Sequence, residues 1–474
     1  MSRRSFAPRA LAELALTAGT TCEPAVTVTG VSDDSRTLEP GDLFFCIRGA
    51  TFDGHDAAPD AVSKGAAGVV ADHELDLPGD IPQLIVPDVR AVVGPVTAAA
   101  LGNPSKKMTM VGVTGTNGKT STASFIGALL EALGNRTLVI GTLTGTRTTP
   151  EAIELQGQIA DAVSAGLTHV VMEVSSHALV MGRVNGIRFD VSVFTNLSRD
   201  HLDFHGSMDG YFAAKCRLFD PSRTGSAVIN IDDEWGTRLA SQVGVPFVTC
   251  AASGLQRVEV AVDSVAYDWR GDRVVVGAGG SFAVANSLAA LETVVALGND
   301  ASSVSAAARA ITPVDGRFES VPTGADWSVI VDYAHTPEAL RSVLSSARAL
   351  SDGRLIVVFG CGGDRDQGKR PEMGAVVAEL ADVAYVTSDN PRSEDPGKII
   401  SEVLAGMDNA SCETVSIIDR AVAIESAISA AGSADIVVIA GKGHEPYQEV
   451  AGEFLAFSDV EVARTAVAGR RGTR

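Results

Sequence analysis

One glycine-rich stretch, near residues 109–134, constrains the fold of this chain more than any other part of the sequence. An apolar run ends at Met110 and Val111, a glycine-rich turn follows, and a helix-like run over residues 122–133 stops at Gly134. A strand, a glycine-rich turn and a helix N-terminus in this order hold phosphate, because backbone N–H groups converge on the oxygens and the helix dipole favours an anion. The stretch therefore predicts an α/β fold, either with a phosphate site or with an ordinary strand-to-helix turn.

The residues at the start of this helix favour a nucleotide site over an ordinary turn. Lys119 is placed to reach the terminal phosphates, and the Thr120 hydroxyl is placed to ligate Mg²⁺. The usual P-loop pattern is not met, because Val113 stands where its first glycine belongs. We predict an ATP or GTP site whose loop residues are Gly115, Thr116, Asn117, Gly118, Lys119, Thr120 and Ser121.

Length and charge limit the classes of function. The chain has 474 residues, which corresponds to about three domains. Its net charge of −20 excludes a large basic surface for nucleic acid or for an anionic membrane. An anionic substrate must therefore be held by local lysine and arginine side chains, by Mg²⁺ and by backbone N–H groups.

Cysteine usage and hydropathy predict a cytoplasmic protein without membrane insertion. The six cysteines are scattered without a C-x-x-C pair, which is typical of free thiols in a reducing cytosol. Arg9 and Glu13 interrupt the segment after the N-terminal arginines, so we expect no export signal there. No apolar run reaches the length that spans a bilayer.

The pattern of strands and helices predicts three α/β domains. Residues 1–106 indicate a small domain, residues 107–312 a domain with a mostly parallel sheet covered by helices on both faces, and residues 313–474 a second doubly wound unit. Ligands in such sheets gather at the carboxyl ends of the strands. The predicted strands lie at 43–47, 68–71, 83–86, 137–140, 168–173, 191–194, 227–230, 328–332, 354–360, 383–386 and 435–440.

Three residues of the central domain are candidates for metal chemistry. Glu173 ends a buried-looking strand, where its carboxylate suits the Mg²⁺ of a bound nucleotide. His201 stands four residues before His205, but Leu202 occupies the position where a zinc protease helix needs Glu, so we reject that class. Single metal-facing histidines and ordinary loop residues both remain open. Lys215 lies in an apolar helical stretch, where it either extends to solvent or acts as an altered metal ligand.

The third domain carries polar clusters that suit an amino acid with both ends charged. The clusters cover residues 332–337, 360–366, 389–392 and 441–445. Arg392 follows a proline in a rigid turn, which suits a bidentate grasp of a carboxylate, and nearby acidic and amide side chains suit an ammonium group. These residues alone predict an ATP-dependent enzyme that joins or phosphorylates a substrate at an inter-domain cleft.

The motifs together resemble the Mur ligase family almost end to end, and within it the MurE type. The resemblance rests on an ordered set at family-like separations: residues 112–121, 173–177, 196–203, 211–219, 332–337, 360–370 and 441–445. It also accounts for the irregular P-loop, whose glycine spacing is similar to the family's own. The resemblance implies an N-terminal UDP-substrate-binding domain, a central P-loop ATPase domain and a C-terminal Rossmann-like domain that brings the amino acid.

The resemblance also implies the ATP and metal ligands. It implies that Lys215 is carbamylated and holds a second Mg²⁺ with His201 and Glu173, while Thr120 and Glu173 hold the first. Lys119, Glu173, His201 and Lys215 are then the catalytic residues. The implied adenine, phosphate and ribose contacts are Asn286, Arg317 and Asp332.

The remaining implied contacts are to the two other substrates. The positions that match UDP-muramoyl-peptide contacts are Ser35, Thr148, Thr149, Ser175 and Arg183. Two departures concern this site: Met181 stands where the family often has Gln, and the turn at residues 50–52 lacks the polar residues common beside the uridine diphosphate. The positions that match meso-diaminopimelate contacts are Arg365, Asp389, Asn390, Pro391, Arg392, Gly441 and Glu445.

The implied reaction is an ATP-dependent amide ligation in peptidoglycan precursor synthesis. It joins meso-diaminopimelate to UDP-N-acetylmuramoyl-L-alanyl-D-glutamate through an acyl phosphate. Arg392 is expected to clamp the distal carboxylate, and a buried guanidinium left unpaired by lysine would discriminate by on the order of several kcal/mol. The alternatives are the same ligation with L-lysine or glutamate as acceptor, and a P-loop kinase or nucleotide switch without ligation. The sequence indicates no protein partner.

Overall fold

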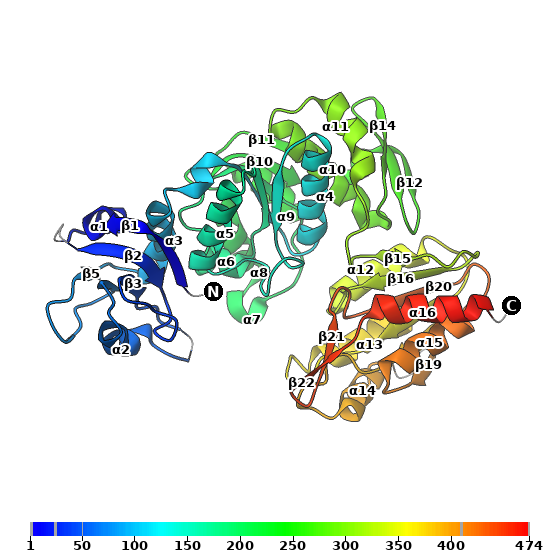
Figure 1. Cartoon of the computed structure of the whole chain (residues 1–474). Helices are drawn as coiled ribbons and strands as arrows, with labels where there is room; N and C mark the ends of the chain where they lie inside the picture. Colours follow the sequence, from blue (N-terminus) through cyan, green and yellow to red (C-terminus); the bar gives the residue numbers. More distant parts are fainter. Residues whose placement is uncertain (1–2, 23–25, 50, 408–410, 473–474) are drawn as a thin grey trace. The chain divides into compact units, whose positions relative to one another are not determined.

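The computed structural model describes residues 3–22, 26–49, 51–407 and 411–472 (Figure 1). The chain divides into two compact units. The first comprises Met1–Cys250 with Glu292–Gly298, and the second comprises Ala251–Leu291 with Asn299–Arg474. No helix among the described residues combines the length and the apolar character needed to cross a bilayer.

A five-stranded sheet forms the N-terminal part of the first unit. Its order is β1 (Arg3–Ala10), β2 (Thr27–Ser32), β3 (Asp42–Phe45), β4 (Gly68–Ala71) and β5 (Gln83–Ile85). Only β1 runs antiparallel to its neighbour. Apolar clusters cover both faces, because successive side chains of the buried strands alternate between them. The helices here are α1 (Leu11–Thr17), α2 (Ala58–Ser63) and α3 (Val89–Ala100).

The central sheet has six parallel strands, which places the turns that follow them along one edge. Its order is β11 (Phe247–Cys250), β10 (Thr224–Asn230), β9 (Phe189–Phe194), β6 (Thr109–Thr114), β8 (His169–Glu173) and β7 (Thr137–Ile140). The helices between and after these strands are α4 (Lys119–Ala132), α5 (Ala152–Ser164), α6 (Ser176–Val180), α7 (Leu202–His205), α8 (Met208–Cys216) and α9 (Glu234–Gln242). The glycine-rich loop therefore lies in the middle of this edge, after β6.

The second unit begins with an antiparallel sheet and ends in a doubly wound one. The first contains β12 (Gln256–Val260), β13 (Val265–Trp269) and β14 (Asp272–Val276), and is followed by α10 (Ser281–Ala296) and α11 (Ala301–Ala307). The second has the order β15 (Glu319–Val321), β16 (Ser328–Asp332), β20 (Ile436–Ala440), β17 (Leu355–Phe359), β18 (Val383–Val386) and β19 (Glu413–Ser416). Only β15 is antiparallel.

Two sets of helices cover the C-terminal sheet. One face packs against α12 (Pro337–Arg348), α13 (Lys369–Leu380) and α14 (Pro396–Leu404). The other packs against α15 (Arg420–Ala430) and α16 (Asp459–Gly472). A separate hairpin of β21 (Tyr447–Val450) and β22 (Glu453–Ala456) follows β20.

The predicted fold class is confirmed: of the five sheets in the described residues, three form the predicted α/β arrangement with helices, and of these the central one is parallel and the last is Rossmann-like. Every predicted strand occurs, with ends within three residues of the prediction, and α4 begins at Lys119, three residues earlier than expected. The sequence did not predict β1, β2, β11–β15, β19, β21 or β22. The boundaries at residues 106 and 312 stay a prediction.

Candidate active site

The glycine-rich loop leaves β6 through backbone conformations that require glycine. Gly115 has φ +154° and Gly118, which caps α4, has φ +80°. A Cβ atom at Gly115 would overlap the hydroxyl of Thr195, the residue that follows β9. The irregular glycine spacing thus corresponds to a close approach between the loop and the neighbouring strand end.

The residues that follow β9 form hydrogen bonds with the glycine-rich loop. The backbone N–H of Thr116 donates to the carbonyl of Asn196 at 2.9 Å, and that of Asn117 donates to Asn196 Oδ1 at 2.9 Å. Thr195 Oγ1 donates to the carbonyl of Asn117 at 2.6 Å, and Thr116 Oγ1 contacts the carbonyl of Ser198 at 3.2 Å. The loop is therefore preformed by contacts that the sequence did not indicate individually.

Two lysine amines converge on the loop carbonyls. Lys119 Nζ donates to the carbonyls of Gly115 at 3.0 Å and Thr116 at 2.8 Å, and Lys215 Nζ donates to that of Gly115 at 2.7 Å. Lys215 is buried on α8, with 1% of its surface exposed. Burial, and secondly the Lys119 charge, lower the pKa of Lys215 well below its ordinary value, against an opposing effect of Asp200. Burial therefore favours the neutral amine over the ammonium form.

Thr120 and Glu173 form an oxygen pair between α4 and the end of β8. Thr120 Oγ1 donates to Glu173 Oε2 at 3.0 Å, and the N–H of Thr142 donates to Glu173 Oε1 at 2.8 Å. Glu173 is 2% exposed, and no cationic side chain of the described residues lies within ion-pair distance of it. A buried carboxylate beside a hydroxyl offers the oxygen donors that Mg²⁺ prefers, so these residues fit the ion.

His201 lies directly before α7, in the segment that follows β9. It has φ +52°, its Nε2 lies 3.4 Å from Asp200 Oδ2, and its ring centroid lies 4.9 Å from that of His177. Burial lowers the pKa of His201, with smaller contributions of the same sign from Lys119 and Lys215. Within the described ranges, no hydrogen bond or ion pair joins Glu173 to His201 or to Lys215.

Three of the positions expected to bind the UDP substrate adjoin Glu173. Thr149 Oγ1 donates to the carbonyl of Glu173 at 2.9 Å and accepts from the N–H of Ser175 at 3.0 Å. Arg183 Nη1 donates to the carbonyl of Thr149 at 3.2 Å, and Arg183 Nη2 pairs with Glu151 at 2.8 Å. The Glu173 carboxyl group and these three predicted positions thus form one continuous hydrogen-bond network.

The other UDP-substrate positions are less tightly connected. Thr148 Oγ1 lies 3.0 Å from Thr142 Oγ1, which links it to the same carboxylate. Ser35 lies in the turn after β2, where its carbonyl accepts from Lys64 Nζ at 2.9 Å. At the departures from the family pattern, Met181 Sδ accepts from Arg183 Nη2 at 3.6 Å, and Phe52 is 60% exposed. Residue Ala50 lies outside the described residues.

The positions expected to hold the nucleoside belong to the second unit. Asn286 is buried on α10. The Asp332 carboxylate accepts from the N–H groups of Phe318 and Ala334, both at 2.7 Å, and burial raises its pKa against the opposing charge of Arg317. The Arg317 guanidinium lies 4.5 Å from the ring centroid of Tyr333. Arg317 and Asp332 therefore share one neighbourhood at the end of β16.

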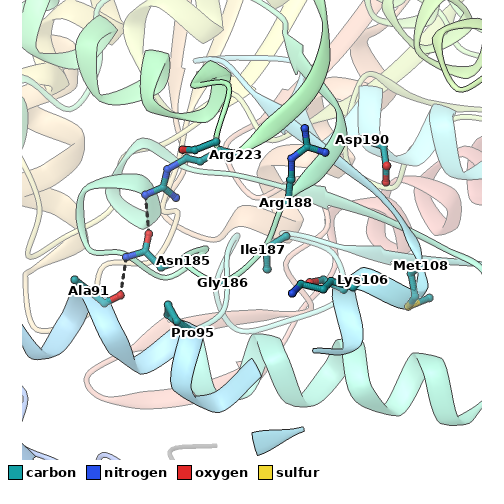
Figure 2. Close-up of a pocket in the computed structure, with 12 residues that line it drawn as sticks. Ala91, Pro95, Lys106, Met108, Asn185, Gly186, Ile187, Arg188, Asp190 and Arg223 are labelled. Atoms are coloured by element: carbon teal, nitrogen blue, oxygen red, sulfur yellow. Dashed lines mark hydrogen bonds between the residues drawn. The ribbon is translucent and has the colours of Figure 1, made fainter. Parts of the chain in front are cut away.

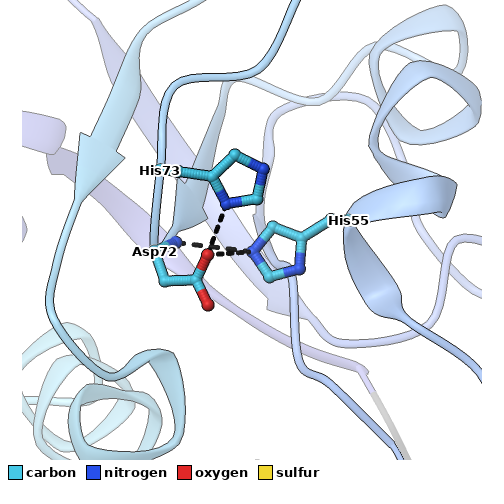
Figure 3. A group of neighbouring side chains, drawn as sticks. All are labelled: His55, Asp72 and His73. Atoms are coloured by element: carbon cyan, nitrogen blue, oxygen red, sulfur yellow. Dashed lines mark hydrogen bonds and ion pairs between the residues drawn. The ribbon is translucent and has the colours of Figure 1, made fainter.

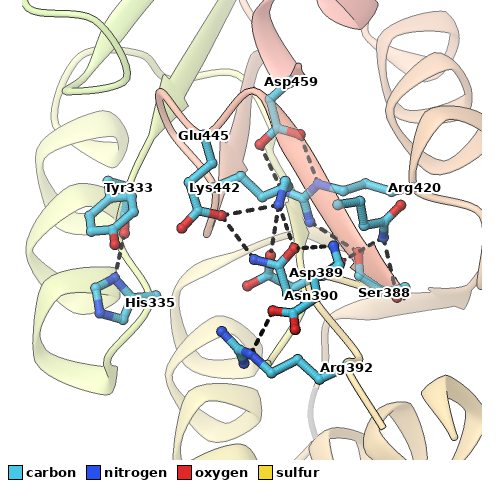
Figure 4. A network of polar contacts seen from close by, with 12 residues as sticks. Tyr333, His335, Ser388, Asp389, Asn390, Arg392, Arg420, Lys442, Glu445 and Asp459 are labelled. Atoms are coloured by element: carbon cyan, nitrogen blue, oxygen red, sulfur yellow. Dashed lines mark hydrogen bonds and ion pairs between the residues drawn. The ribbon is translucent and has the colours of Figure 1, made fainter. Parts of the chain in front are cut away.

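A buried lysine joins the two turns expected to bind the amino acid (Figure 4). Lys442 has a fully buried side chain, and its Nζ lies 2.9 Å from Asn390 Oδ1, 3.1 Å from Glu445 Oε2 and 3.6 Å from Asp389 Oδ1. Asn390 Nδ2 also donates to Glu445 Oε2 at 2.9 Å. Lys442 belongs to the predicted cluster at residues 441–445, but the sequence gave it no role. Its position between two glycines directly after a buried strand is the sequence feature that could have identified it.

Arg392 differs from the expectation in one respect. The sequence predicted a buried guanidinium that lysine would leave unpaired, but the Arg392 side chain is 22% exposed and its Nε lies 3.0 Å from Glu449 Oε2. Its Nη1 also donates to the carbonyl of Gly363 at 2.6 Å. The predicted unpaired charge is therefore wrong, because β21 brings a carboxylate that no sequence signal indicated.

The other predicted amino-acid positions surround Arg392. Arg365 is exposed, and both Arg365 and Arg392 lie within 4 Å of the position that a Cβ atom would take at Gly362. Pro391 is buried directly before Arg392. Gly441 has φ +122°, and its N–H donates to the carbonyl of Asp332 at 3.1 Å, which links the amino-acid turn to the nucleoside positions of the same unit.

A histidine cluster in the N-terminal sheet lies apart from these positions (Figure 3). Potential ligand atoms of His55, Asp72 and His73 lie within 4.8 Å of one another. Arg48 Nε lies 3.2 Å from Asp72 Oδ2, so a guanidinium already compensates the carboxylate. The ring of His55 is oriented by Asp53, whose Oδ1 lies 2.6 Å from Nδ1.

A pocket of about 520 Å³ opens near the amino ends of β6 and β9 (Figure 2). Arg223 donates to Asn185 Oδ1 at 2.8 Å, and Asn185 Nδ2 donates to the carbonyl of Ala91 at 3.2 Å. Lys106 and Arg188 line the same pocket. It contains none of the residues predicted to bind substrates and lies at the edge of the sheet opposite the glycine-rich loop.

Comparison with known proteins agrees with this arrangement. Three family models match the chain: "Mur ligase family, catalytic domain" at residues 27–109, "Mur ligase middle domain" at 113–294 and "Mur ligase, glutamate ligase domain" at 316–443. The chain is 43% identical to the UDP-N-acetylmuramoyl-L-alanyl-D-glutamate--2,6-diaminopimelate ligase of Syntrophomonas wolfei, over 94% of this chain and 95% of that protein.

A second curated protein and a solved structure carry the same name. The Streptomyces coelicolor ligase is 41% identical, over 98% of this chain and 97% of its own length. A solved structure of a UDP-N-acetylmuramoyl-L-alanyl-D-glutamate--2,6-diaminopimelate ligase superposes with a TM-score of 0.68 and 32% identity, over 93% of this chain and 95% of that one. The similarity therefore spans the loop, the oxygen pair and the C-terminal turns.

Proposed function

This chain belongs to the Mur ligase family, and we propose that it is the ATP-dependent ligase that joins meso-diaminopimelate to UDP-N-acetylmuramoyl-L-alanyl-D-glutamate. One observation carries the proposal. Relatives named for this reaction match the chain at 43% identity over 94% of its length, a span that includes both the ATP loop and the amino-acid turns. The same turns contain an arginine beside acidic side chains, which suits an amino acid with a charged far end.

The first step is activation of the D-glutamyl carboxylate. A carboxylate oxygen attacks the γ-phosphorus of ATP, the bond to the β-phosphate oxygen breaks, and an acyl phosphate and ADP result. Lys119 and the N–H groups of the loop other than those of Thr116 and Asn117, which donate to Asn196, stabilise the charge on the transferring phosphoryl group. Thr120 and Glu173 would hold Mg²⁺, which would supply further positive charge there. The UDP substrate is held by Ser35, Thr148, Thr149, Ser175 and Arg183, and the nucleoside by Asn286, Arg317 and Asp332.

Lys215 provides a second anionic ligand in this proposal. A neutral amine attacks carbon dioxide, an N–C bond forms and a proton leaves, which gives a carbamate anion. Burial lowers the pKa of the Lys215 amine, which favours its neutral form, and His201 and Glu173 would hold a second Mg²⁺ that neutralises the carbamate. Buried Lys215 and half-buried His201 both lie beside the loop, and both are close enough to Lys119 for its charge to lower their pKa values.

The second step is attack by the amino acid. The amine of meso-diaminopimelate attacks the carbonyl carbon of the acyl phosphate, phosphate leaves, and an amide remains. Arg365 and Arg392 bind carboxylate groups, while Asp389, Asn390, Pro391, Gly441 and Glu445 shape the site around them. Lys442 neutralises Asp389 and Glu445, because its Nζ lies within 3.6 Å of both carboxylates.

We also propose domain boundaries and a cellular location. The UDP-substrate domain comprises residues 1–106, the ATP domain 107–312 and the amino-acid domain 313–474. The matched family models support these limits, because one model ends at residue 109 and the next starts at 113, and the last starts at 316. We place the reaction in the cytoplasm, where ATP is available.

Phosphate release from the purified full chain tests the proposal. The assay contains ATP, Mg²⁺ and UDP-N-acetylmuramoyl-L-alanyl-D-glutamate, with meso-diaminopimelate, L-lysine or L-glutamate as acceptor. We expect release that depends on both the UDP substrate and meso-diaminopimelate, with much lower rates for the other two acceptors. ATP turnover that is indifferent to any amino acid would instead indicate a kinase or nucleotide switch, and preference for lysine would reassign the acceptor.

A further inference from the structure

Three cationic side chains line the pocket near the amino ends of β6 and β9 (Figure 2). Lys106 precedes β6, Arg188 precedes β9 and Arg223 precedes β10. Of the lining residues in the described chain, Asp190 alone is acidic, and its Oδ2 accepts from the N–H of Met110 at 2.7 Å. The pocket therefore has an excess of positive charge, although the chain as a whole carries a net charge of −20.

Two of these cations have no partner in the part of the chain that the structure describes. The side chains of Lys106 and Arg188 make neither a hydrogen bond nor an ion pair there, and both are exposed. Acidic residues outnumber Lys and Arg by 58 to 38 in this sequence, so counterions are plentiful elsewhere on the chain. Unpaired cations that share one pocket create a local positive potential, which attracts an anion from solution.

The third cation, Arg223, is held in a fixed orientation. Pro95 lies inside α3 and has no N–H, so the carbonyl of Ala91 loses its helical partner. Asn185 Nδ2 donates to this carbonyl at 3.2 Å, and Asn185 Oδ1 accepts from Arg223 Nη2 at 2.8 Å. Within the described ranges, Nε and Nη1 of Arg223 make no hydrogen bond. The guanidinium is therefore oriented by one nitrogen and keeps donors for a ligand.

The wall of the pocket beside Arg223 is closely packed. A Cβ atom at Gly94 of α3 would lie 2.2 Å from the carbonyl oxygen of Asn185, and one at Gly186 would lie 2.9 Å from the Cα atom of Pro95. The helix and the loop before β9 therefore touch without intervening side chains, which fixes the position of Asn185. Buried Met108 and Ile187 also line the pocket. Apolar surface beside positive charge suits an organic anion better than a fully hydrated inorganic ion.

We propose that this pocket is a ligand site separate from the predicted substrate positions, and that it binds a small organic molecule with two or more negative charges. Two guanidinium groups and one ammonium group can pair with phosphate or carboxylate groups. The volume of about 520 Å³ lies within the range of small-molecule sites. The ligand would contact α3 of the N-terminal part and the segments before β6, β9 and β10 of the central sheet.

Titration calorimetry on the full chain, without divalent metal and at 0.15 M ionic strength, tests this inference. Fructose 1,6-bisphosphate and citrate are the probes for phosphate and carboxylate groups, and acetate is the probe with a single charge. We expect at least one of the first two to bind with a dissociation constant below about 1 mM, and acetate to give no measurable binding. The double variant Lys106→Gln/Arg188→Gln should weaken this binding at least about tenfold, because two charge-assisted contacts are lost.

Two further variants serve as controls. Lys107→Gln removes an exposed lysine next to Lys106 that does not line the pocket, so it should leave the dissociation constant within about twofold. Lys119→Ala removes the lysine of the glycine-rich loop, where an anion could also bind, and should likewise leave probe binding unchanged. The double variant should fold normally, because both of its altered side chains are exposed.

The outcomes decide the inference and identify the anionic group. Binding of the bisphosphate alone, of citrate alone or of both supports the site if it is lost in the double variant, and the probe that binds identifies the group. Failure of both probes to bind the unmodified chain overturns the inference, as does equal binding by the double variant. Binding that is lost in Lys119→Ala instead places the probe at the glycine-rich loop and also overturns it. None of these measurements depends on ligation, so the proposed function is tested separately by phosphate release.

Discussion

Lys215 combines complete burial with a position next to the phosphate loop. A lysine without an ion-pair partner is costly to bury as a charged group, and Lys215 donates only to the carbonyl of Gly115 within the described chain. Its lowered pKa reduces that cost by favouring the neutral amine. A fixed amine whose neutral form is favoured is suited to chemical modification at this point.

Replacement of Lys215 separates a structural role from the proposed ligand role. For Lys215→Ala we expect amino-acid-dependent phosphate release to fall by about two orders of magnitude or more, comparable with loss of a strong electrostatic contact in a transition state. Added acetate or formate should restore part of the rate, because a small carboxylate can replace the carbamate. Lys107→Ala, at an exposed lysine, is the control. Full activity in Lys215→Ala would remove the second-metal role.

Asp33 is expected to make the free energy of unfolding depend on pH. Burial, and secondly the nearby Glu151 charge, raise the pKa of Asp33 to about 6 from the ordinary 3.8. Between about pH 4 and pH 6 the folded chain therefore keeps a proton on Asp33 that the unfolded chain releases. The contribution of this group to the free energy of unfolding is fully present below about pH 4 and is lost as the pH rises through about 6. At neutral pH the charged carboxylate destabilises the fold by up to about 3 kcal/mol.

Asp33→Asn should remove this dependence. We expect urea unfolding to show a variant more stable than the unmodified chain by about 1 to 3 kcal/mol at pH 7.5, with the difference closing at pH 4. Asp76→Asn, at an exposed position, should show no such pattern. An equal stability difference at both pH values would contradict the assigned pKa.

Arg420 is the first residue of α15 and connects the carboxyl ends of β18 and β20. The two predicted amino-acid turns follow these strands. The Arg420 guanidinium donates to the carbonyls of Ser388 at 3.4 Å and Ala440 at 3.0 Å, and it pairs with Asp459 of α16 through two contacts of 2.7 Å. Both side chains of the pair are fully buried. The helix therefore fixes the turns after β18 and β20 from the face away from Arg392 (Figure 4).

Removal of either Arg420 or Asp459 alone leaves the other as an unpaired buried charge, whereas removal of both leaves none. We expect Arg420→Met to lower the free energy of unfolding by about 3 to 5 kcal/mol, and the double variant Arg420→Met/Asp459→Leu to recover much of that loss. Urea unfolding of the single, double and unmodified chains measures the cycle. Arg341→Met, which removes an exposed pair with Glu379, is the matched control. A double variant less stable than the single one would contradict this account.

Burial explains which elements the sequence can predict. Strands β6, β8, β16 and β20 are buried on both faces of parallel sheets and appear in the sequence as continuous apolar runs. The missed strands are mostly edge or antiparallel ones with a solvated face: β1 contains three arginines and a proline, and β12 is almost entirely exposed. Their pairing partners provide the stabilisation, and those partners are not visible in the local pattern.

The same distinction applies to the site. Thr120 lies at the start of α4, which follows β6, and Glu173 ends the neighbouring parallel strand β8, so their contact follows from the topology that the sequence predicts. Glu449 reaches Arg392 from a hairpin that the sequence did not predict, 57 positions away along the chain. Asn196 begins the motif at residues 196–203, but the contacts that Thr195 and Asn196 make with the loop depend on the order of the strands.

At the scale of the whole molecule, the proposed roles are divided between the two compact units. The phosphate loop, the oxygen pair and four UDP-substrate positions of the central sheet belong to the first unit, and the amino-acid turns belong to the second. Each set is held by hydrogen bonds within its own unit. Substitutions in the amino-acid turns are therefore expected to leave binding of the UDP substrate intact.

Arg392→Ala tests this division. We expect kcat/KM for meso-diaminopimelate to fall about a hundredfold, since a charge-assisted contact is lost and Glu449 is left without its partner. The dissociation constant of the UDP substrate, measured by titration calorimetry on the full chain, should change less than about twofold. Arg309→Ala, at an exposed arginine of the same unit, should alter neither quantity. An unchanged KM for meso-diaminopimelate would refute the clamp, and a parallel loss of UDP-substrate binding would show that the two units do not act separately in recognition.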